Sequence, residues 1–419
     1  MDWYNYIAWA AIGAQLLFVY HAVRNYRYAM ADYKSREPLS YRPRVALIVP
    51  CKGLDAHFQS NIRSFFAQDY DNYRLFFVVG EKSDPAYAEL RNARAALRQS
   101  SRASDVQIFV AGPPSACSQK THNLLYVFHR LGEETEVLAF ADSDVCVHDD
   151  WLGHLVQPLR RSKYGVSTGY RWFIPTKNNL ASLALSAVNA GIAQLLGNTV
   201  FNHAWGGSMA VRAEDFRRLN VPEIWKKTLS DDLSLSHTVK EAGMRVIFVP
   251  GCLVPSFESM TWRGFYEFAR RQFLITRVYV PKTWWVGFAS SLGSVLGLWA
   301  TAGLAVYAGT RGTGHMLLYV SVPVIFFVGQ LLRAVLRQSV GAKFLREYRA
   351  RLKWTAVADV LGSWLWSLVL LFFILASAFG RTIRWRGIRY RLISPIQTEV
   401  LPDRQPSASG GAASHVRHS

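Results

Sequence analysis

Two aspartates, Asp142 and Asp144, follow an apolar run at residues 137 and 138 in the segment EVLAFADSDV, where a strand is predicted to end. One residue separates the two carboxylates, which repel each other unless a cation lies beside them. Carboxylate oxygens suit Mg²⁺ and Mn²⁺, and these ions keep positions open for phosphate oxygens. The pair therefore indicates either a divalent metal site that neutralises a leaving diphosphate or a solvated turn, because Asp and Ser are common after strands.

A second acidic pair, Asp231 and Asp232, opens a predicted helix in the segment TLSDDLSLSHTVKEAG. An acid at this position can cap the first turn of the helix, and this is the interpretation that the pair alone favours. The segment WGGSMAVR precedes this helix. Its glycines, Gly206 and Gly207, would let the backbone approach a sugar closely, or would form an ordinary turn.

Strands and helices alternate between residues 44 and 282 and must position these acids. Strands are predicted at RVALIVPCK, RLFFVVGEKSD, VQIFVAG and EVLAFADSD, with helical patterns between them at residues 57–68, 86–98 and 121–131. This alternation predicts βαβ units, and hence a Rossmann-like α/β fold with a mostly parallel sheet. Ligands bind at the carboxyl ends of the strands in such sheets, where the acids after the second and fourth strands lie.

The composition indicates a membrane protein. The 419 residues include 48 Lys+Arg against 29 Asp+Glu, for a formal net charge of +19, and half of the residues are hydrophobic. A positive surplus fits either nucleic-acid binding or the positive-inside rule, and the long apolar runs favour the membrane. Residues 6–23 are apolar and a basic segment follows, which predicts an N-terminal anchor over residues 1–25 with its far end in the cytoplasm. The four dispersed cysteines are typical of reduced thiols.

Three more apolar stretches predict a C-terminal membrane region over residues 283–392; they lie at residues 284–307, 316–336 and 355–379. If all three crossed the membrane, the basic segments at residues 333–353 and 381–392 would lie on opposite sides of it. Gly362 and Ser363 interrupt the third stretch. We therefore predict a re-entrant segment or a hairpin of two short helices that returns the chain to the cytoplasmic side. Residues 393–419 are predicted to form a disordered, low-complexity tail.

The order of these segments resembles family 2-type glycosyltransferases with the GT-A fold, and in particular the ceramide glucosyltransferase branch, which includes bacterial lipid glycosyltransferases. The matching segments cover about residues 44–281; they are PCKGLDAHFQSNIRSFFAQDYDNYRLFFVVGEKSDPA, SQKTHNLL, FADSDV, WGGSMAVR and SDDLSLS. The resemblance implies a GT-A catalytic domain at residues 44–282. It also implies inverting transfer of a sugar from a UDP-sugar to the hydroxyl group of a ceramide-type membrane lipid, with Mg²⁺ or Mn²⁺ as cofactor.

The resemblance also implies roles for individual residues. Asp142 and Asp144 match the second acidic motif, with Asp144 the expected direct metal ligand, and Asp232 matches the third, whose acid is the catalytic base. Further residues lie in motifs expected near the donor: Asp84 beside the nucleotide base, Lys120 and Asn123 beside the diphosphate, and Gly207 beside the sugar. Glu81 is also expected beside the nucleotide base, but it departs from the pattern because an aspartate is usual there.

The last motif departs from the pattern. In the segment FYEFARRQF, Arg271 keeps the arginine that is expected to contact phosphate or acceptor, with Arg270 beside it. Gln272 stands where the resemblance leads us to expect tryptophan, so stacking by that ring is lost. Basic residues next to an apolar helix also bind anionic lipid headgroups without a catalytic role.

Two other functions fit parts of the pattern. A processive polysaccharide synthase needs more membrane spans and usually an intact Gln-x-x-Arg-Trp motif. A non-catalytic membrane scaffold with a degenerate GT-A domain would not need Asp142, Asp144 and Asp232. We therefore expect an enzyme in a bacterial inner membrane, multi-pass, with a cytoplasmic catalytic domain and with no nucleic-acid partner.

Overall fold

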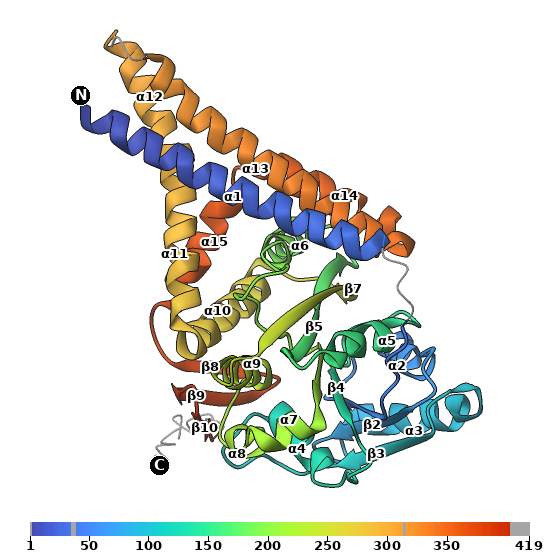
Figure 1. Ribbon diagram of the computed structural model, residues 1–419. Coiled ribbons are helices and arrows are strands. Elements are labelled where there is room, and N and C mark those ends of the chain that lie inside the picture. The colour runs from blue at the N-terminus through green and yellow to red at the C-terminus, as the bar shows by residue number, and fades with distance from the viewer. Residues whose placement is uncertain (1, 35–38, 313–315, 403–419) are drawn as a thin grey trace, which may run out of the picture.

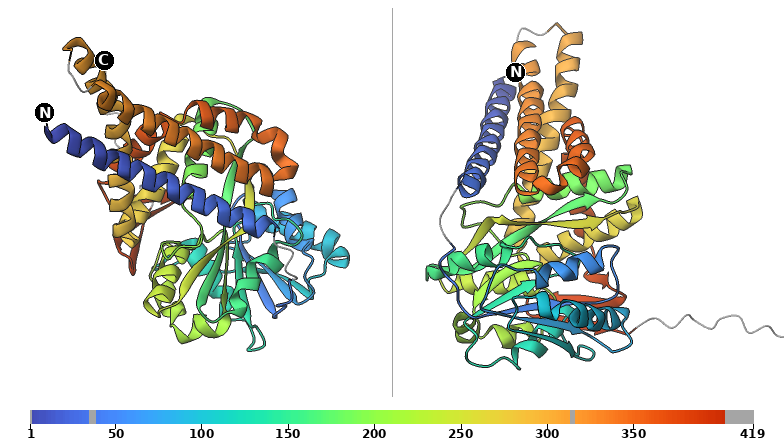
Figure 2. Two further views of the ribbon diagram at one scale, coloured as in Figure 1. Left: turned by 45° about the horizontal axis from the view of Figure 1, so that its top comes forward. Right: turned by 90° about the vertical axis from the view of Figure 1, so that its right-hand side faces the viewer.

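The computed structural model describes residues 2–34, 39–312 and 316–402. An α/β domain forms one half of the molecule and long apolar helices project from it on one side (Figures 1 and 2). Residues 2–34, 281–312 and 316–377 form the helical half, while most of residues 45–258 form the α/β domain.

A seven-stranded sheet organises the α/β domain in the order β3-β2-β1-β4-β6-β5-β7. The strands are β1 (Val45–Pro50), β2 (Tyr73–Val79), β3 (Asp105–Val110), β4 (Val137–Ala141), β5 (Tyr164–Pro175), β6 (Ser208–Arg212) and β7 (Arg245–Glu258). All neighbours pair in parallel except β6, which runs antiparallel to both β4 and β5. The predicted mostly parallel α/β fold is confirmed.

Helices cover both faces of the sheet. The side chains of each strand alternate between the two faces, so apolar residues on both faces are buried against helices. In β1, Val45, Leu47 and Val49 pack with α2 (Phe58–Phe66), α3 (Pro85–Leu97) and α5 (Trp151–Val156). Ala46 and Ile48 point to the other face. There they pack with α4 (Gln119–Phe128), α7 (Ala213–Arg218), α8 (Val221–Trp225) and α9 (Asp231–Glu241). The central strands therefore read as continuous apolar runs.

Three helices among the described residues are long and apolar enough to cross a membrane: α1 (Asp2–Lys34), the continuous segment from α11 (Pro281–Val295) through a π-helical turn into α12 (Thr301–Thr310), and α13 (Met316–Phe344). The predicted N-terminal helix is present but extends beyond residue 25. α14 (Arg349–Leu361) and α15 (Trp366–Ser377) meet at an angle of 89°. The predicted break at Gly362 and Ser363 is therefore confirmed.

Two helices lie between the sheet and the long helices (Figure 1). α6 (Leu180–Ala193) contacts β5 on one side and α13 and α14 on the other. α10 (Trp262–Tyr279) contacts α11 and α15. Phe173 of β5 joins one apolar cluster with Leu185 of α6, Phe265 of α10 and Phe373 of α15. The α/β half and the helical half therefore share a core.

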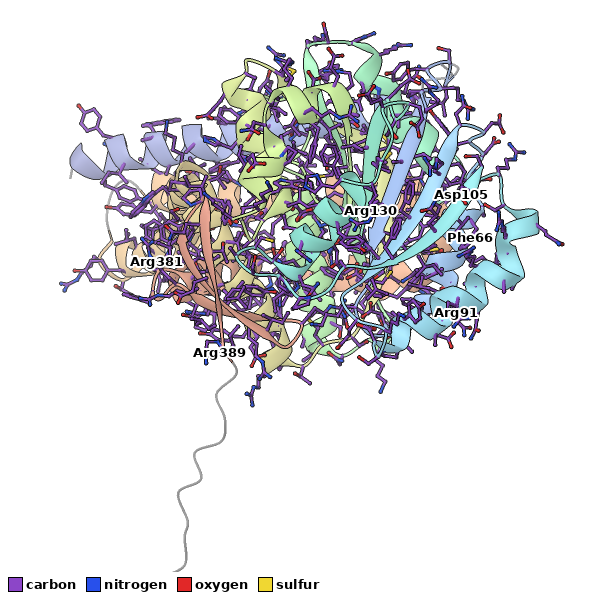
Figure 3. The ribbon with its side chains drawn as sticks, turned by 90° about the horizontal axis from the view of Figure 1, so that it is seen from below. Phe66, Arg91, Asp105, Arg130, Arg381 and Arg389 are labelled. Carbon is purple, nitrogen blue, oxygen red and sulfur yellow. The ribbon has the colours of Figure 1, made fainter. Side chains whose placement is uncertain are left out.

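A C-terminal sheet, which we call the meander, follows α15. It consists of β8 (Thr382–Trp385), β9 (Ile388–Ser394) and β10 (Gln397–Leu401), paired antiparallel. Ile383, Tyr390 and Leu392 pack against Leu274 of α10 and Leu229 before α9, while Arg381 and Arg389 lie on the underside seen in Figure 3. The predictions that residues 381–392 belong to the membrane region and that a disordered tail begins at residue 393 are wrong here, because alternating apolar side chains bury one face of these strands. Residues 403–419 lie outside the described part of the chain.

Candidate active site

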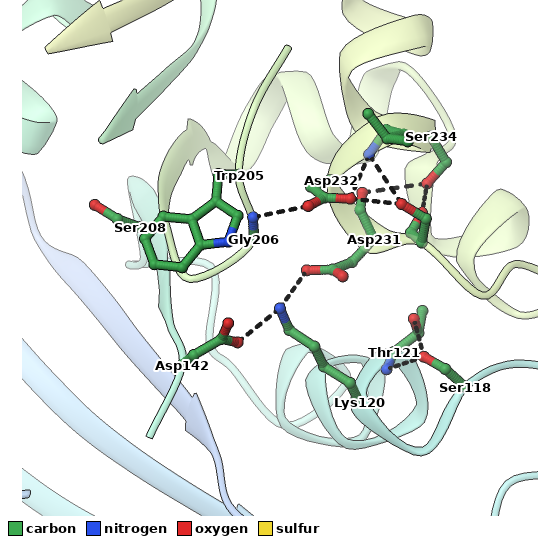
Figure 4. A network of polar contacts seen from close by, with 12 residues as sticks. Ser118, Lys120, Thr121, Asp142, Trp205, Gly206, Ser208, Asp231, Asp232 and Ser234 are labelled. Atoms are coloured by element: carbon green, nitrogen blue, oxygen red, sulfur yellow. Dashed lines mark hydrogen bonds and ion pairs between the residues drawn. The ribbon is translucent and has the colours of Figure 1, made fainter. Parts of the chain in front are cut away.

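Asp142 and Asp144 follow β4 at the carboxyl edge of the sheet, and cations hold both of them (Figure 4 shows Asp142). Lys120 Nζ lies 2.8 Å from Asp142 Oδ1. Arg171, from the middle of β5, lies 3.1 Å from Asp142 Oδ2 and 3.4 Å from Asp144 Oδ2. A guanidinium group thus bridges the two carboxylates that the sequence places one residue apart.

The environment separates the pKa values of these two acids. Burial raises the pKa of the Asp142 carboxyl, but Lys120 and Arg171 lower it more, so the net pKa falls below its usual value. For Asp144, burial raises the pKa, Arg171 opposes it, and the Asp142 charge raises it again, so the net pKa is above its usual value. One member of the pair is therefore firmly ionised, while the other gains most from an additional cation.

The donor set fits a divalent cation. Asp144 Oδ1 is buried and has no hydrogen-bond partner among the described residues, and such an orphaned acceptor needs a ligand. Hard carboxylate oxygens are what Mg²⁺ and Mn²⁺ require. Asp142 and Asp144 would hold the ion, with Arg171 beside it as a second positive charge.

Lys120 connects the first acidic pair to the second. α4 begins just before it, where the Ser118 side chain caps the helix by accepting from the Thr121 amide. The Lys120 ammonium lies 3.1 Å from Asp231 Oδ2 as well as against Asp142 (Figure 4). Its pKa is shifted by burial, which lowers it, and more strongly by the surrounding carboxylates, which raise it above the usual value. Lys120 therefore stays positively charged between Asp142, which follows β4, and Asp231, which begins α9.

The two acids at the start of α9 differ in environment. Asp231 is 3% exposed; burial raises its pKa to about 7 against the opposing charge of Lys120. Asp232 is partly exposed. Its Oδ2 accepts from the Gly206 amide at 3.0 Å, while Oδ1 accepts from the Ser230 hydroxyl at 2.5 Å and the Leu233 amide at 2.7 Å. Asp231 thus faces the cations, and Asp232 fixes the loop before β6.

Gly206 and Gly207 are glycines because side chains approach their backbone closely. A Cβ at Gly206 would lie 2.4 Å from Asp231 Oδ2, and one at Gly207 would lie 2.1 Å from the Trp205 ring and 2.7 Å from Asp142 Oδ2. The neighbouring Trp205 ring lies 4.7 Å from the Arg171 guanidinium carbon, a cation–π distance. The sequence segment WGGS therefore forms one wall of the site.

Arg271 comes from α10, and the positive charges of Arg171 and Arg386 act on it. Burial lowers its pKa to about 10, and the charges of Arg171 and Arg386 add to that effect. Among the described residues it forms no ion pair, and its guanidinium carbon lies 6.0 Å from the Trp385 ring of the meander. A tryptophan was expected directly after Arg271, where the chain has Gln272. The ring of Trp385, more than a hundred residues further along the chain, lies near Arg271 instead.

Three predicted donor residues follow β2 or lie in α4. Asp84 caps α3 and accepts from the Gly53 amide at 2.9 Å, so it joins the loops after β1 and β2. Asn123 is buried and accepts from Gln119 at 2.8 Å. Glu81 is exposed after β2. Asp84 and Asn123 position backbone segments around the site.

The structure does not bring Arg270 and Gln272 into this cluster. Arg270 donates to the carbonyl oxygens of Ala376 and Phe379 at the end of α15, at 3.1 and 2.9 Å. A cation at this place satisfies carbonyl groups that a helix end leaves unpaired. Gln272 is exposed.

Sequence reasoning missed Arg171 and Arg386. Arg171 is the single charged residue inside the apolar strand YGVSTGYRWFIP, and that isolation was a usable signal. Arg386 was hidden in a segment whose charge is typical of membrane flanks. Asp231 was recognised only as the neighbour of the predicted base.

Comparison with known proteins identifies the family. The sequence of residues 7–395 matches the glycosyl transferase family 21. The chain belongs to this family. The resemblance to GT-A glycosyltransferases drawn from the sequence is thereby confirmed, and this family 21 chain is a glycosyltransferase, an enzyme that transfers a sugar.

Solved structures resemble the family 21 chain only distantly. A mannosyltransferase from Pyrobaculum calidifontis, solved with GDP-Man and Mn²⁺, is 16% identical with a TM-score of 0.46; the match covers 88% of this chain and 94% of that one. Glucosyl-3-phosphoglycerate synthase from Mycobacterium tuberculosis, in complex with phosphoglyceric acid, is 13% identical with a TM-score of 0.35; the match covers 57% of this chain and 83% of that one.

Proposed function

We propose that this family 21 chain transfers a single hexose from a UDP-sugar to the hydroxyl group of a ceramide-type membrane lipid, with inversion at the anomeric carbon. One observation carries the proposal: Asp142 and Asp144, the cations Lys120 and Arg171, and the acids of α9 gather at one edge of the sheet. This is the constellation that departure of a diphosphate and deprotonation of a hydroxyl group together require.

The cations act on the leaving group. Mg²⁺ or Mn²⁺ bound by Asp142 and Asp144 would supply positive charge to the donor's diphosphate. Lys120, Arg171 and Arg271 add fixed positive charge around the same position. Because these groups are held by packing and ion pairs before the reaction, they need little reorganisation as negative charge develops on the leaving oxygen.

Asp232 is our proposed base. The acceptor oxygen attacks the anomeric carbon, the bond from that carbon to the diphosphate oxygen breaks, and the hydroxyl proton passes to Asp232. An α-linked donor then gives a β-linked product and UDP. Asp232 is more accessible than Asp231, whereas the pKa of about 7 of Asp231 lies closer to the value that general base catalysis favours. We assign Asp231 to holding Lys120.

A lipid acceptor is supported by the apolar surroundings. The Arg171 guanidinium carbon lies 5.4 Å from the ring of Phe173, two residues further along β5. Phe173 belongs to the cluster formed by α6, α10 and α15. The polar site thus adjoins the core that joins the catalytic domain to the apolar helices, so an acceptor hydroxyl could reach the site while its acyl chains stay with those helices.

We further propose a cytoplasmic catalytic domain in a bacterial inner membrane. The basic residues that follow the first apolar stretch support this orientation, as do the four free cysteines. The meander packs on α10, so the chain returns to the catalytic side after the bent pair α14 and α15.

The test uses purified protein in nanodiscs that contain ceramide. UDP-glucose, UDP-galactose, UDP-N-acetylglucosamine and GDP-mannose are added one at a time with Mn²⁺, with or without EDTA, and the lipids are analysed by mass spectrometry and NMR. We expect one UDP-sugar to give a lipid carrying one β-linked sugar, with no product in EDTA. A GDP-mannose product, an α-linkage or a long polysaccharide would each contradict a stated part of the proposal, and the absence of any glycolipid would reject the acceptor.

A further inference from the structure

The tip of the meander reaches the edge of the candidate active site. Arg386 lies in the turn between β8 and β9, and its guanidinium nitrogens are 3.2 and 3.3 Å from the two Asp55 carboxylate oxygens. It also donates to the Lys52 carbonyl oxygen at 3.4 Å. Lys52 and Asp55 lie in the loop that follows β1, the strand beside β4. A residue near the C-terminus thus contacts the carboxyl edge of the catalytic sheet.

Arg386 belongs electrostatically to the site. Partial burial lowers its pKa, but Asp55 and then Asp144 and Asp142 raise it more, so the net pKa is above its usual value. In turn, the Arg386 charge lowers the pKa of Arg271. These electrostatic effects agree with the contact between Arg386 and the loop after β1, which lies beside the strand that carries Asp142 and Asp144.

The backbone at Arg386 is held in an unfavourable conformation. Its φ is +47°, and that of the following Gly387 is +86°. Two positive values suit a tight hairpin turn, for which Asn-Gly is the preferred sequence. An arginine in the left-handed region is less stable than glycine or asparagine, which adopt it more readily. Such a local cost is a reason to look for a function of the side chain.

The rest of the meander fixes this tip relative to Lys120. The Tyr390 hydroxyl accepts from the Gln119 amide, the residue before Lys120, at 3.2 Å. Tyr390 and Leu392 are buried against Leu229 and Leu274. The tip is therefore anchored both to the start of α4 and to α10, the two helices that supply Lys120 and Arg271.

We propose that Arg386 binds the diphosphate of the nucleotide-sugar donor, exchanging its ion pair with Asp55 for the donor's phosphate oxygens. The proposal rests on the function proposed above. The pair with Asp55 suits exchange because it is partly exposed, with 42% of the Arg386 side chain and 25% of the Asp55 side chain accessible, and such pairs are weak. A guanidinium group binds phosphate in a bidentate manner, which favours arginine over lysine here.

The experiment compares UDP with uridine, which lacks the diphosphate. Binding of each to full-length protein in nanodiscs is measured by calorimetry with Mn²⁺ for the wild type, Arg386→Asn and Arg386→Lys. Asparagine tolerates the left-handed turn, so Arg386→Asn removes the charge without straining the hairpin. Arg384→Asn is the matched control, because Arg384 is exposed on the same hairpin and, among the described residues, its side chain makes no hydrogen bond or ion pair with the site.

We expect Arg386→Asn to weaken UDP binding about 10- to 100-fold, as loss of a charge-assisted contact implies, while uridine binding stays within twofold. Arg386→Lys should lie between, and Arg384→Asn should match the wild type. Unchanged UDP affinity in Arg386→Asn would overturn the inference, and so would an equal loss for uridine, which would mean a deformed site. If the wild type did not bind UDP, the proposed function would fail first and the inference with it.

Discussion

Replacing Asp232 with asparagine separates its structural role from its proposed chemical role. In the wild type, the Ser230 hydroxyl and the Leu233 amide lie 2.5 and 2.7 Å from Asp232 Oδ1. Asparagine keeps an oxygen that can accept from both groups. The second oxygen, 3.0 Å from the Gly206 amide, becomes an NH₂ group and can no longer accept. One unsatisfied amide costs about 1–3 kcal/mol when fully buried, and less here because Asp232 is partly exposed. We expect a loss of about 1 kcal/mol, or a few degrees in Tm.

The chemical cost should be much larger. Loss of a general base lowers a rate about 10²- to 10⁴-fold, which corresponds to about 3–5 kcal/mol in the activation free energy. Transfer to the lipid is measured under single-turnover conditions, UDP binding by calorimetry and Tm by scanning fluorimetry. We expect Asp232→Asn to retain UDP binding and nearly all of its stability while transfer falls by at least 10²-fold.

Asp231→Asn is the matched comparison, because it makes the same change one residue away. Lys120 would keep its contact with Asp142 at 2.8 Å, so we expect transfer to fall less than tenfold. If Asp231→Asn lost transfer and Asp232→Asn kept it, Asp231 with its pKa of about 7 would be the base. If both variants stayed active, a carboxylate base on α9 would be refuted.

Three further predictions follow from other parts of the structure. Asp144→Ala should abolish transfer and Mn²⁺-dependent UDP binding while Tm stays close to the wild type; near-normal turnover would reject the metal assignment. Burial raises the pKa of Asp231 to about 7 in the folded protein, so the folded state keeps this proton to higher pH than the unfolded chain, and the stability of the wild type should fall between about pH 4 and 7. Asp231→Asn should have a flatter profile of Tm against pH, and an equal slope would contradict the assignment. Asp359→Ala should leave Arg337 of α13 without the buried carboxylate that it now contacts at 2.6 Å and cost about 3–5 kcal/mol; denaturant unfolding in detergent measures this, and a loss below about 1 kcal/mol would count against it.

The central part of the site was predictable because its residues lie where parallel strands end. β1 and β4 are short apolar runs, and their carboxyl ends lie side by side in a parallel sheet. Asp142 directly follows one of these runs, and Asp232 lies at the start of a helix that the sequence pattern predicts. Lys120 precedes the helix predicted at residues 121–131 and was expected in the site only from the family resemblance. Local patterns thus placed the acids, and the resemblance placed the lysine.

Arg171 and Arg386 depend on pairings between distant segments. Arg171 reaches the site only because β5 pairs with β6 and β7, and no local pattern fixes that order. Arg386 follows an apolar stretch, where positive charge usually marks the cytoplasmic flank of a helix. The alternation of apolar residues on either side of an Arg-Gly turn, at positions 383, 385, 388, 390 and 392, is nevertheless a hairpin pattern. Charge obscured that pattern.

Lipid analysis in cells tests the central claim, sugar transfer to a membrane lipid at the DSD site, most directly. Extracts from cells that express the wild type and cells that express Asp144→Ala at equal protein levels are compared by liquid chromatography and mass spectrometry. We predict a lipid one hexose heavier than its precursor in the wild-type extract, with the precursor accumulating in Asp144→Ala. Identical lipid profiles in the two extracts, or the same glycolipid in both, would contradict the account.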